Sequence, residues 1–444
     1  MAHKEDMPAP LGHSSVSALP ASGTHPHDRS VRRGFTLATI ASSDLLISLC
    51  MQLYVVTVVG VGSSTDAYFA GQVIPVSIYG ILQLPLQRAI IAAFAGRDAA
   101  VFPAARLWLM FTVLAACLLG ALAALAPFYL RYVFPSLAAG EFRTTTHIFW
   151  LQSAAVVLMT GNLILSSLNQ VVGRFVQCEL VNVTSTVASA CVVLATVGEL
   201  GVVALALGAV FKAALSALAY RAMLRGRIGS GKSPWSEVWS IVRPMVAAGS
   251  LSKFAPVVDR SIASAAAAGS LTLLTLAQTI YSAATVLVER AVVAPLLPGL
   301  RRQGNSRATV ATAGWLALCA VVVVAVVVVG VALAAHSTMI HRWLSAEQLR
   351  MLVGCLLALG GFSVGGLSGQ WLSAALVVLG RADLSSRVAI YGFLLSVPMK
   401  LAAFSLWGIY GLALAISCYY LLNALIMAVL LASIRTTSDS VRAF

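Results

Sequence analysis

The stretch GSSTDAYFAGQVIPVSIYGILQLPLQRAIIAAFAGR, Gly62 to Arg97, decides the fold because it is apolar and membrane-length yet polar along one stripe. A helix here places four residues at i, i+3, i+7 and i+11 on one face: Gln72, Pro75, Tyr79 and Gln83. An unpaired amide is costly in hydrocarbon, so this face should contact protein or water. Hydrogen bonding between helices and lining of a substrate site both explain the stripe. Asp66 and Arg88 bracket it and favour the second, since ionisable residues inside membranes commonly mark function.

Composition excludes a water-soluble globule. The 444 residues are 59% hydrophobic and only 10% charged, with a mean hydropathy of +0.92. The polar first 34 residues lack the apolar core of a signal peptide, so we expect the first span to be retained. The net charge of +14 comes without an aromatic-studded basic patch, which argues against a nucleic-acid partner. The sequence therefore indicates a multi-pass membrane protein.

Hydropathy and helix breakers predict an all-α integral membrane protein with about twelve spans. We expect them near residues 35–60, 66–93, 105–130, 146–168, 175–197, 200–223, 240–266, 270–298, 309–335, 348–376, 384–406 and 409–434. With the N-terminus in the cytoplasm, most basic residues of the connections fall on the cytoplasmic side. Four fall outside: Arg131, Arg143, Arg342 and Arg350. The positive-inside rule thus predicts that both termini are cytoplasmic.

An internal repeat is visible at an offset of 207 residues. Gly62 and Thr65 match Gly269 and Thr272, and further matches include Gly173-Arg174 with Gly380-Arg381 and Gly201 with Gly408. Six spans per repeat is an even number, so the halves are parallel repeats of the kind found in secondary transporters. The predicted organisation is a cytoplasmic N-terminal tail (1–34), an N-terminal six-helix lobe (35–224), a cytoplasmic linker (225–238), a C-terminal lobe (239–434) and a cytoplasmic C-terminal tail (435–444).

The second half repeats the polar stripe. Four polar residues again lie at i, i+3, i+7 and i+11: Gln278, Tyr281, Thr285 and Glu289. The stripes end alike, in LQRAIIA with Arg88 and VERAVVA with Glu289 and Arg290. We therefore count Gln278, Tyr281, Glu289 and Arg290 with the first stripe as candidate cavity residues.

A cationic face is predicted on the helix before this second stripe. Lys253 and Arg260 are seven residues apart and share a face, Pro256 permits a bend, and Asp259 is a nearby counter-ion. Such a face suits an anionic substrate. The alternative is that Asp259 neutralises one of the cations and the helix merely packs. Two more charged residues inside predicted spans are further candidates: Lys400, just after Pro398, and Asp44. Lys212 fits a side chain that snorkels to the interface.

Nothing in the residue pattern suggests covalent chemistry. The spacing provides no His/Glu metal cluster, activated serine or cysteine, or paired carboxylates, so we predict neither an enzyme nor a metal site or cofactor. Transport is the economical interpretation, with coupling to a proton or sodium gradient or to the membrane potential left open.

Three segments resemble the multidrug/oligosaccharidyl-lipid/polysaccharide (MOP) exporter superfamily, and within it the lipid II flippase (MurJ) family. They are GSSTDAYFAGQVIP (Gly62 to Pro75), VVDRSIASAAAAGSLTLLTLAQTIY (Val257 to Tyr281) and RAVVAPLLPGL (Arg290 to Leu300), with a weaker likeness over Phe35 to Ile434. The resemblance implies two six-helix lobes that form a V around a cationic cavity. It also implies alternating access that moves a polyprenyl-diphosphate-linked glycan across the bacterial inner membrane. Asp66 matches the family's acidic residue at the start of helix 2, and Asp259 a polar position of helix 7.

The sequence departs from that family at its basic positions. Ser77, Ile78 and Tyr79 stand where lipid II flippases carry an arginine, and Ala277-Gln278-Thr279 stands for Ala-Asp-Arg. The family's final two helices are also lacking. Cationic contacts would come instead from other basic residues: Arg88, Lys253, Arg260 or Arg290. A lipid-linked oligosaccharide of another envelope polysaccharide thus fits at least as well as the peptidoglycan precursor.

Three functions stay open. The leading one is a flippase whose partners are a lipid-linked glycan, membrane lipids and glycan-synthesis enzymes. The second is a cation-coupled multidrug exporter of the same superfamily, which would need net acidic residues in its lobes to bind protons or sodium and cationic drugs. Here bases outnumber or pair with the acidic residues of the spans: Asp44, Asp66, Asp259 and Glu289. The third is a non-transporting scaffold for glycan synthesis, against which the polar residues inside the spans argue.

Overall fold

The computed structural model describes residues 26–94, 105–135, 137–227, 229, 235–288, 306–334, 344–378 and 381–442. Over these residues the chain is helical and contains no strand. The helices are α1 (Pro26–Val59), α2 (Ser63–Phe94), α3 (Ala105–Val133), α4 (Ala139–Val171), α5 (Phe175–Leu200), α6 (Val203–Met223), α7 (Trp235–Lys253), α8 (Ala255–Ser264), α9 (Ser270–Val288), α11 (Ser306–Ala334), α12 (Ala346–Ala358), α13 (Gly360–Val378) and α14 (Ala382–Arg442).

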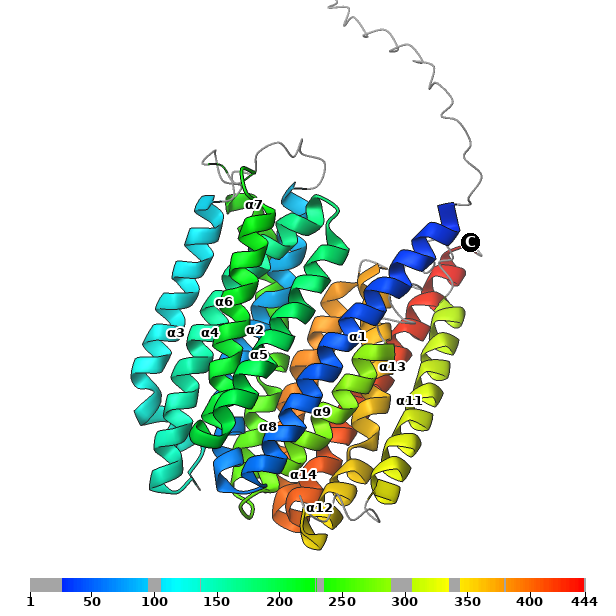
Figure 1. The fold of residues 1–444 in the computed structure, drawn as a ribbon. Helices are drawn as coiled ribbons and strands as arrows, with labels where there is room; N and C mark the ends of the chain where they lie inside the picture. The colour runs from blue at the N-terminus through cyan, green and yellow to red at the C-terminus, as the bar shows by residue number, and fades with distance from the viewer. Residues whose placement is uncertain are drawn as a thin grey trace, which may run out of the picture.

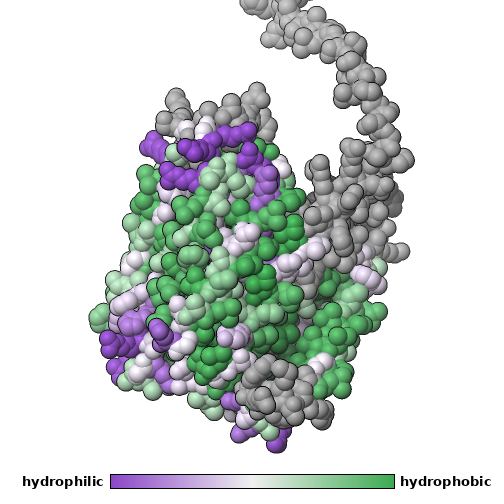
Figure 2. Space-filling model, viewed as in Figure 1, coloured by the Kyte–Doolittle hydropathy of each residue, from purple (hydrophilic) through white to green (hydrophobic). Residues whose placement is uncertain are grey.

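The helices confirm the predicted all-α membrane fold. Nine segments of the described chain are long and apolar enough to cross a membrane, and the last of them, Asp383–Ser433, covers two predicted spans. The visible face carries a broad apolar band between polar atoms at its upper and lower ends, as expected for a protein surrounded by hydrocarbon (Figure 2). Several helices extend beyond the predicted spans; at the two ends of the chain, α1 begins at Pro26 and α14 continues to Arg442.

The repeat seen in the sequence reappears in the backbone. Gly201, between α5 and α6, has φ 54° and ψ −132°, and its counterpart Gly408, inside α14, has φ 58° and ψ −138°. This combination is strained for any residue with a side chain, so both repeats need glycine at the bend before their sixth helix. The bend at Gly408 divides α14 into the two spans that the sequence predicts.

The helices form two lobes. We call α1 to α6 the N-lobe and α7 to α14 the C-lobe; the lobes converge at the lower end of Figure 1. Both α1 and α14 have their chain-terminal ends at the upper end, which we call the termini end (Figure 1). Helices α2 and α9 begin at the opposite end, which we call the latch end. The cytoplasmic location of the termini end stays a prediction.

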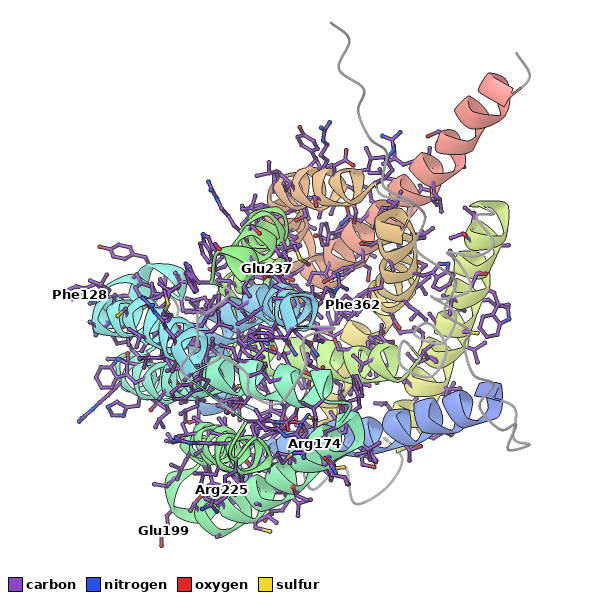
Figure 3. The ribbon with its side chains drawn as sticks, turned by 90° about the horizontal axis from the view of Figure 1, so that it is seen from above. Phe128, Arg174, Glu199, Arg225, Glu237 and Phe362 are labelled. Carbon is purple, nitrogen blue, oxygen red and sulfur yellow. The ribbon has the colours of Figure 1, made fainter. Side chains whose placement is uncertain are left out.

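Helix α7 breaks the symmetry between the lobes. Its apolar side, with Val238 and Val242 fully buried, joins the N-lobe core formed around Leu86, Phe94 and Leu107. Its Trp235 ring also packs 5.0 Å from that of Phe111 in α3. Seen from the termini end, α7, marked by Glu237, lies beside the N-lobe helices (Figure 3). The first helix of the C-lobe therefore packs against the N-lobe near the termini end.

Candidate functional site: the contacts between the lobes

The lobes are joined at the latch end by Asp66, in the first turn of α2. Its Oδ2 accepts a hydrogen bond from the backbone N–H of Gly269 (2.6 Å), and its Oδ1 accepts from the N–H (2.7 Å) and the hydroxyl (2.6 Å) of Thr272. These N–H groups begin α9, where helix geometry leaves donors without partners and the dipole favours a negative charge. Asp66 of the N-lobe thus caps a helix of the C-lobe.

This contact also joins two residues that the internal repeat relates to each other. The hydroxyl of Thr272 lies 3.0 Å from that of Thr65, its counterpart one repeat earlier. Gly269 has φ +87°, and a Cβ there would lie 2.8 Å from the Val61 side chain, so only glycine fits. We call Thr65, Asp66, Gly269 and Thr272 the interlobe latch. Asp66 has no acidic counterpart, because Leu273 stands one repeat later.

Further bonds between the lobes lie at the same end. Gln348 of α12 donates to the carbonyl of Val61 (3.1 Å), and Ser261 of α8 donates to that of Val133. These acceptors lie at the latch-end limits of α2 and α3. The latch end is therefore closed by polar contacts as well as by packing.

Arg260 is the basic candidate that lies between the lobes. Its Nη1 donates to the carbonyl of Phe69 (3.0 Å), and its guanidinium carbon lies 5.9 Å from the centre of the Phe69 ring. Its Nε is buried without a hydrogen-bond partner. Arg260 thus contacts the N-lobe through a carbonyl and a ring, rather than a carboxylate, and retains donor capacity for an anionic group.

Lys253 also faces α2, at a point nearer the termini end than Arg260. Helices α7 and α8 are separated at Phe254, and Pro256 follows in the first turn of α8, as the predicted bend requires. Lys253 is exposed, and its Cδ is the atom nearest to a Cβ built on Gly80, at 3.9 Å. Lys253 and Arg260 therefore both face α2, although a break in the helix separates them.

Asp259 is paired with Lys400, and the two are among the most buried charged groups described. Its Oδ1 lies 2.6 Å from Nζ of Lys400, whose side chain is 0% exposed. Lys400 Nζ also lies 5.0 Å from the centre of the Tyr419 ring. Asp259 thus forms its ion pair with Lys400, which is distant in sequence, and not with Lys253 or Arg260, the cations that the alternative named. Neither residue is open to a substrate in this conformation.

The two polar stripes differ in exposure. On α2, Gln72 and Tyr79 are half-buried, while Gln83 and Arg88 are exposed. On α9, Gln278 is half-buried, whereas Tyr281 is fully buried and donates its hydroxyl to the carbonyl of Leu356 (2.8 Å). Tyr281 therefore packs inside the C-lobe and is not open to a substrate in this conformation. Glu289 and Arg290 lie outside the described residues.

A polar network joins α1, α5 and α6, and the sequence predicts its charged residues but not their pairing. Asp44 of α1 lies 3.1 Å from Nζ of Lys212 in α6, and its Oδ1 also accepts from the hydroxyl of Thr186 in α5. Lys212 is the residue for which the sequence suggests a snorkelling side chain, and the structure shows that its ammonium pairs with Asp44. A search for oppositely charged residues in different spans of one lobe would have found this pair.

Comparison with solved structures places these contacts in a known architecture. No family model and no curated protein matches the sequence. The structure of the lipid II flippase MurJ in an inward closed conformation superposes with a TM-score of 0.73 and 15% identity, over 90% of this chain and 87% of that one. The inward-facing structure of a multidrug resistance MATE family transporter of the MOP superfamily gives 0.72 and 15%, over 92% and 99%. The chain has the fold of MOP superfamily transporters.

The outward-facing structure of a MATE family transporter of that superfamily superposes less well. Its TM-score is 0.62, at 14% identity, over 93% of this chain and 97% of that one. The MOP fold accounts for the two lobes and for the parallel repeats. At this identity it fixes the fold and not the substrate.

Proposed function

We propose that the chain is a flippase that moves a polyprenyl-diphosphate-linked oligosaccharide across the bacterial inner membrane by alternating access. The observation that carries this proposal is Arg260, a guanidinium between the lobes that donates to a carbonyl, lies beside a ring and has a buried Nε without a hydrogen-bond partner. A diphosphate is the ligand that best matches spare guanidinium donors, because bonds between arginine and phosphate are charge-assisted and often bidentate. Lys253, on the same α2-facing side, would add a second positive charge.

The bonds at the latch end suggest which state of the cycle this structure represents. Asp66, Gln348, Ser261 and Arg260 all join the lobes near that end. With the termini in the cytoplasm, the closed end would face outward, in agreement with the higher TM-score against the inward-facing transporter. Outward opening would break the Asp66 contacts and release the N-terminus of α9.

A cation-coupled multidrug exporter is the second candidate, because a MATE family transporter superposes as well as the flippase does. A cationic drug would need an available carboxylate between the lobes. Of the acidic candidates that the structure describes, Asp66 is engaged by a helix N-terminus, Asp259 by Lys400 and Asp44 by Lys212. Glu289 lies outside the described residues. The engagement of the three aspartates favours the flippase.

The test is a headgroup-accessibility assay in vesicles that contain the purified protein and a fluorescent polyprenyl-diphosphate oligosaccharide. We expect protein-dependent movement of the headgroup that Arg260→Ala abolishes and Lys253→Ala reduces. The matched control is Arg225→Ala, which removes an exposed arginine beyond α6 (Figure 3) and should leave the rate unchanged. Equal rates for the wild type and Arg260→Ala would overturn the cationic diphosphate site.

A further inference from the structure

Each lobe contains an aspartate on one of its opening helices and a lysine on a later helix, and the two form an ion pair. In the N-lobe, Asp44 of α1 pairs with Lys212 of α6; in the C-lobe, Asp259 of α8 pairs with Lys400 of α14. An ionised carboxylate inside a membrane protein needs hydrogen bonds or a nearby positive charge, because an isolated ion is strongly disfavoured in a low-dielectric medium. Both carboxylates obtain that charge from the chain itself.

The C-lobe pair is sealed from water. Asp259 is 4% exposed and Lys400 is 0% exposed. The ammonium lies 2.6 Å from the carboxylate and 5.0 Å from the centre of the Tyr419 ring. Lys400 and Tyr419 stand on opposite sides of the bend at Gly408, so the ammonium connects α8 to both halves of α14.

The N-lobe pair is more open. The side chain of Lys212 is 33% exposed and that of Asp44 is 28% exposed, at a separation of 3.1 Å. Thr186 of α5 donates to the same carboxylate oxygen. This pair therefore holds α1, α5 and α6 together and is only partly buried.

The two pairs are not copies of each other through the repeat. One repeat after Lys212 stands Tyr419, and one repeat before Lys400 stands Val193. The lysines thus come from different helices of their lobes, yet each neutralises an aspartate of that lobe's opening helices. The shared feature is the chemistry, an ammonium fixed beside the carboxylate.

We infer that Lys400 and Lys212 are tethered counter-cations, which occupy the positions that a Na⁺ or K⁺ ion would otherwise take beside Asp259 and Asp44. A diffusible cation at these sites would couple each transport cycle to an ion gradient. A covalently attached ammonium acts at a high effective concentration and cannot be carried away. Wild-type transport is therefore independent of Na⁺ and K⁺, and removal of a lysine creates a cation site.

The first test measures binding on the purified protein and needs no transport. Thermal unfolding is followed in sodium, potassium and choline chloride at equal ionic strength. We expect one Tm in all three salts for the wild type, and a higher Tm in sodium or potassium than in choline for Lys400→Ala. The double variant Asp259→Asn/Lys400→Met, which lacks both charges, should lose that preference.

Lys212→Ala provides the same test in the N-lobe, where the half-exposed pair is less critical for folding, and it decides the question if Lys400→Ala does not fold. A wild-type Tm that rises in sodium or potassium relative to choline would overturn the inference. So would folded lysine variants without any cation preference.

The second test measures transport and rests on the proposed flippase function. Headgroup movement in the vesicle assay should be the same in sodium, potassium and choline for the wild type. Lys400→Ala should become faster in sodium or potassium than in choline by at least about fivefold, the lower end of typical coupling between sites. Absence of any lipid movement would refute the flippase but not the tethered cations, which the unfolding test judges alone.

Discussion

Asp66→Asn is the most informative single change in the interlobe latch. The carboxylate accepts three hydrogen bonds from the start of α9, at 2.6, 2.7 and 2.6 Å. An asparagine oxygen could keep the two bonds from Thr272, but its amide NH₂ would face the N–H of Gly269, donor against donor. The variant also loses the negative charge beside the N-terminus of α9.

The cost follows from these losses. A hydrogen bond to a charged group contributes about 1.5–3 kcal/mol, and a charge at a helix N-terminus contributes about 0.3–1 kcal/mol. Together these losses should reduce the free energy that favours the closed latch by roughly 2–4 kcal/mol. The lower value reduces the closed-to-open ratio about 30-fold. A latch closed in about 99% of molecules would fall to about 77%.

Double electron–electron resonance between spin labels measures this shift directly. Ala139 and Ala346 are exposed, begin α4 and α12 at the latch end, and belong to different lobes. Labels on cysteines at these positions, in a background without the exposed native cysteines, should show a new population at longer distance in Asp66→Asn. Thr279→Val is the matched control, because that hydroxyl bonds only within α9. A distance distribution identical to the wild type would refute the reasoning.

Three further predictions concern packing, and thermal unfolding in detergent measures each. Gly365→Ala should lower stability by about 1–3 kcal/mol through overpacking, because the added Cβ would lie 2.4 Å from the backbone of Tyr420. Gly366→Ala is the control and should be near neutral, because its Cβ would have no neighbour nearer than 4.0 Å. Equal effects of the two substitutions would contradict this packing. Gly201→Ala and Gly408→Ala should each cost about 1–3 kcal/mol, because both glycines have the same strained φ and ψ; a neutral result at either would contradict their equivalence. Tyr281→Phe should cost about 1–3 kcal/mol by leaving the carbonyl of Leu356 without that donor, with lipid movement unchanged; lost movement in a stable variant would return Tyr281 to the candidate cavity.

The sequence predicts the parts of the fold that depend on local chemistry. Hydropathy locates the spans, Pro256 locates the break between α7 and α8, and Gly408 separates the two spans of α14. The 207-residue offset predicts the repeat, and the Thr65–Thr272 contact joins two residues related by that offset. These features depend on residue type and spacing alone, so one sequence suffices to find them.

The partners of the charged residues were harder to predict because they depend on packing between distant segments. The sequence places Asp259 beside Arg260, but the side chain of Asp259 points to Lys400 on another helix. Asp66 is recognisable as an ionisable residue at a helix start, yet nothing local shows that it caps α9. Spacing along one helix fixes which face a residue occupies, while the element that meets that face is set by tertiary packing.

We propose that the lobes move a lipid-linked anion rather than a cationic drug. The most direct measurement uses vesicles of one preparation, loaded either with the fluorescent polyprenyl-diphosphate oligosaccharide or with a cationic dye, with the wild type and Arg260→Ala compared for each. We predict protein-dependent movement of the lipid headgroup that Arg260→Ala abolishes, and no protein-dependent movement of the dye. Movement of the dye with the lipid left in place would contradict the account and establish the drug exporter instead.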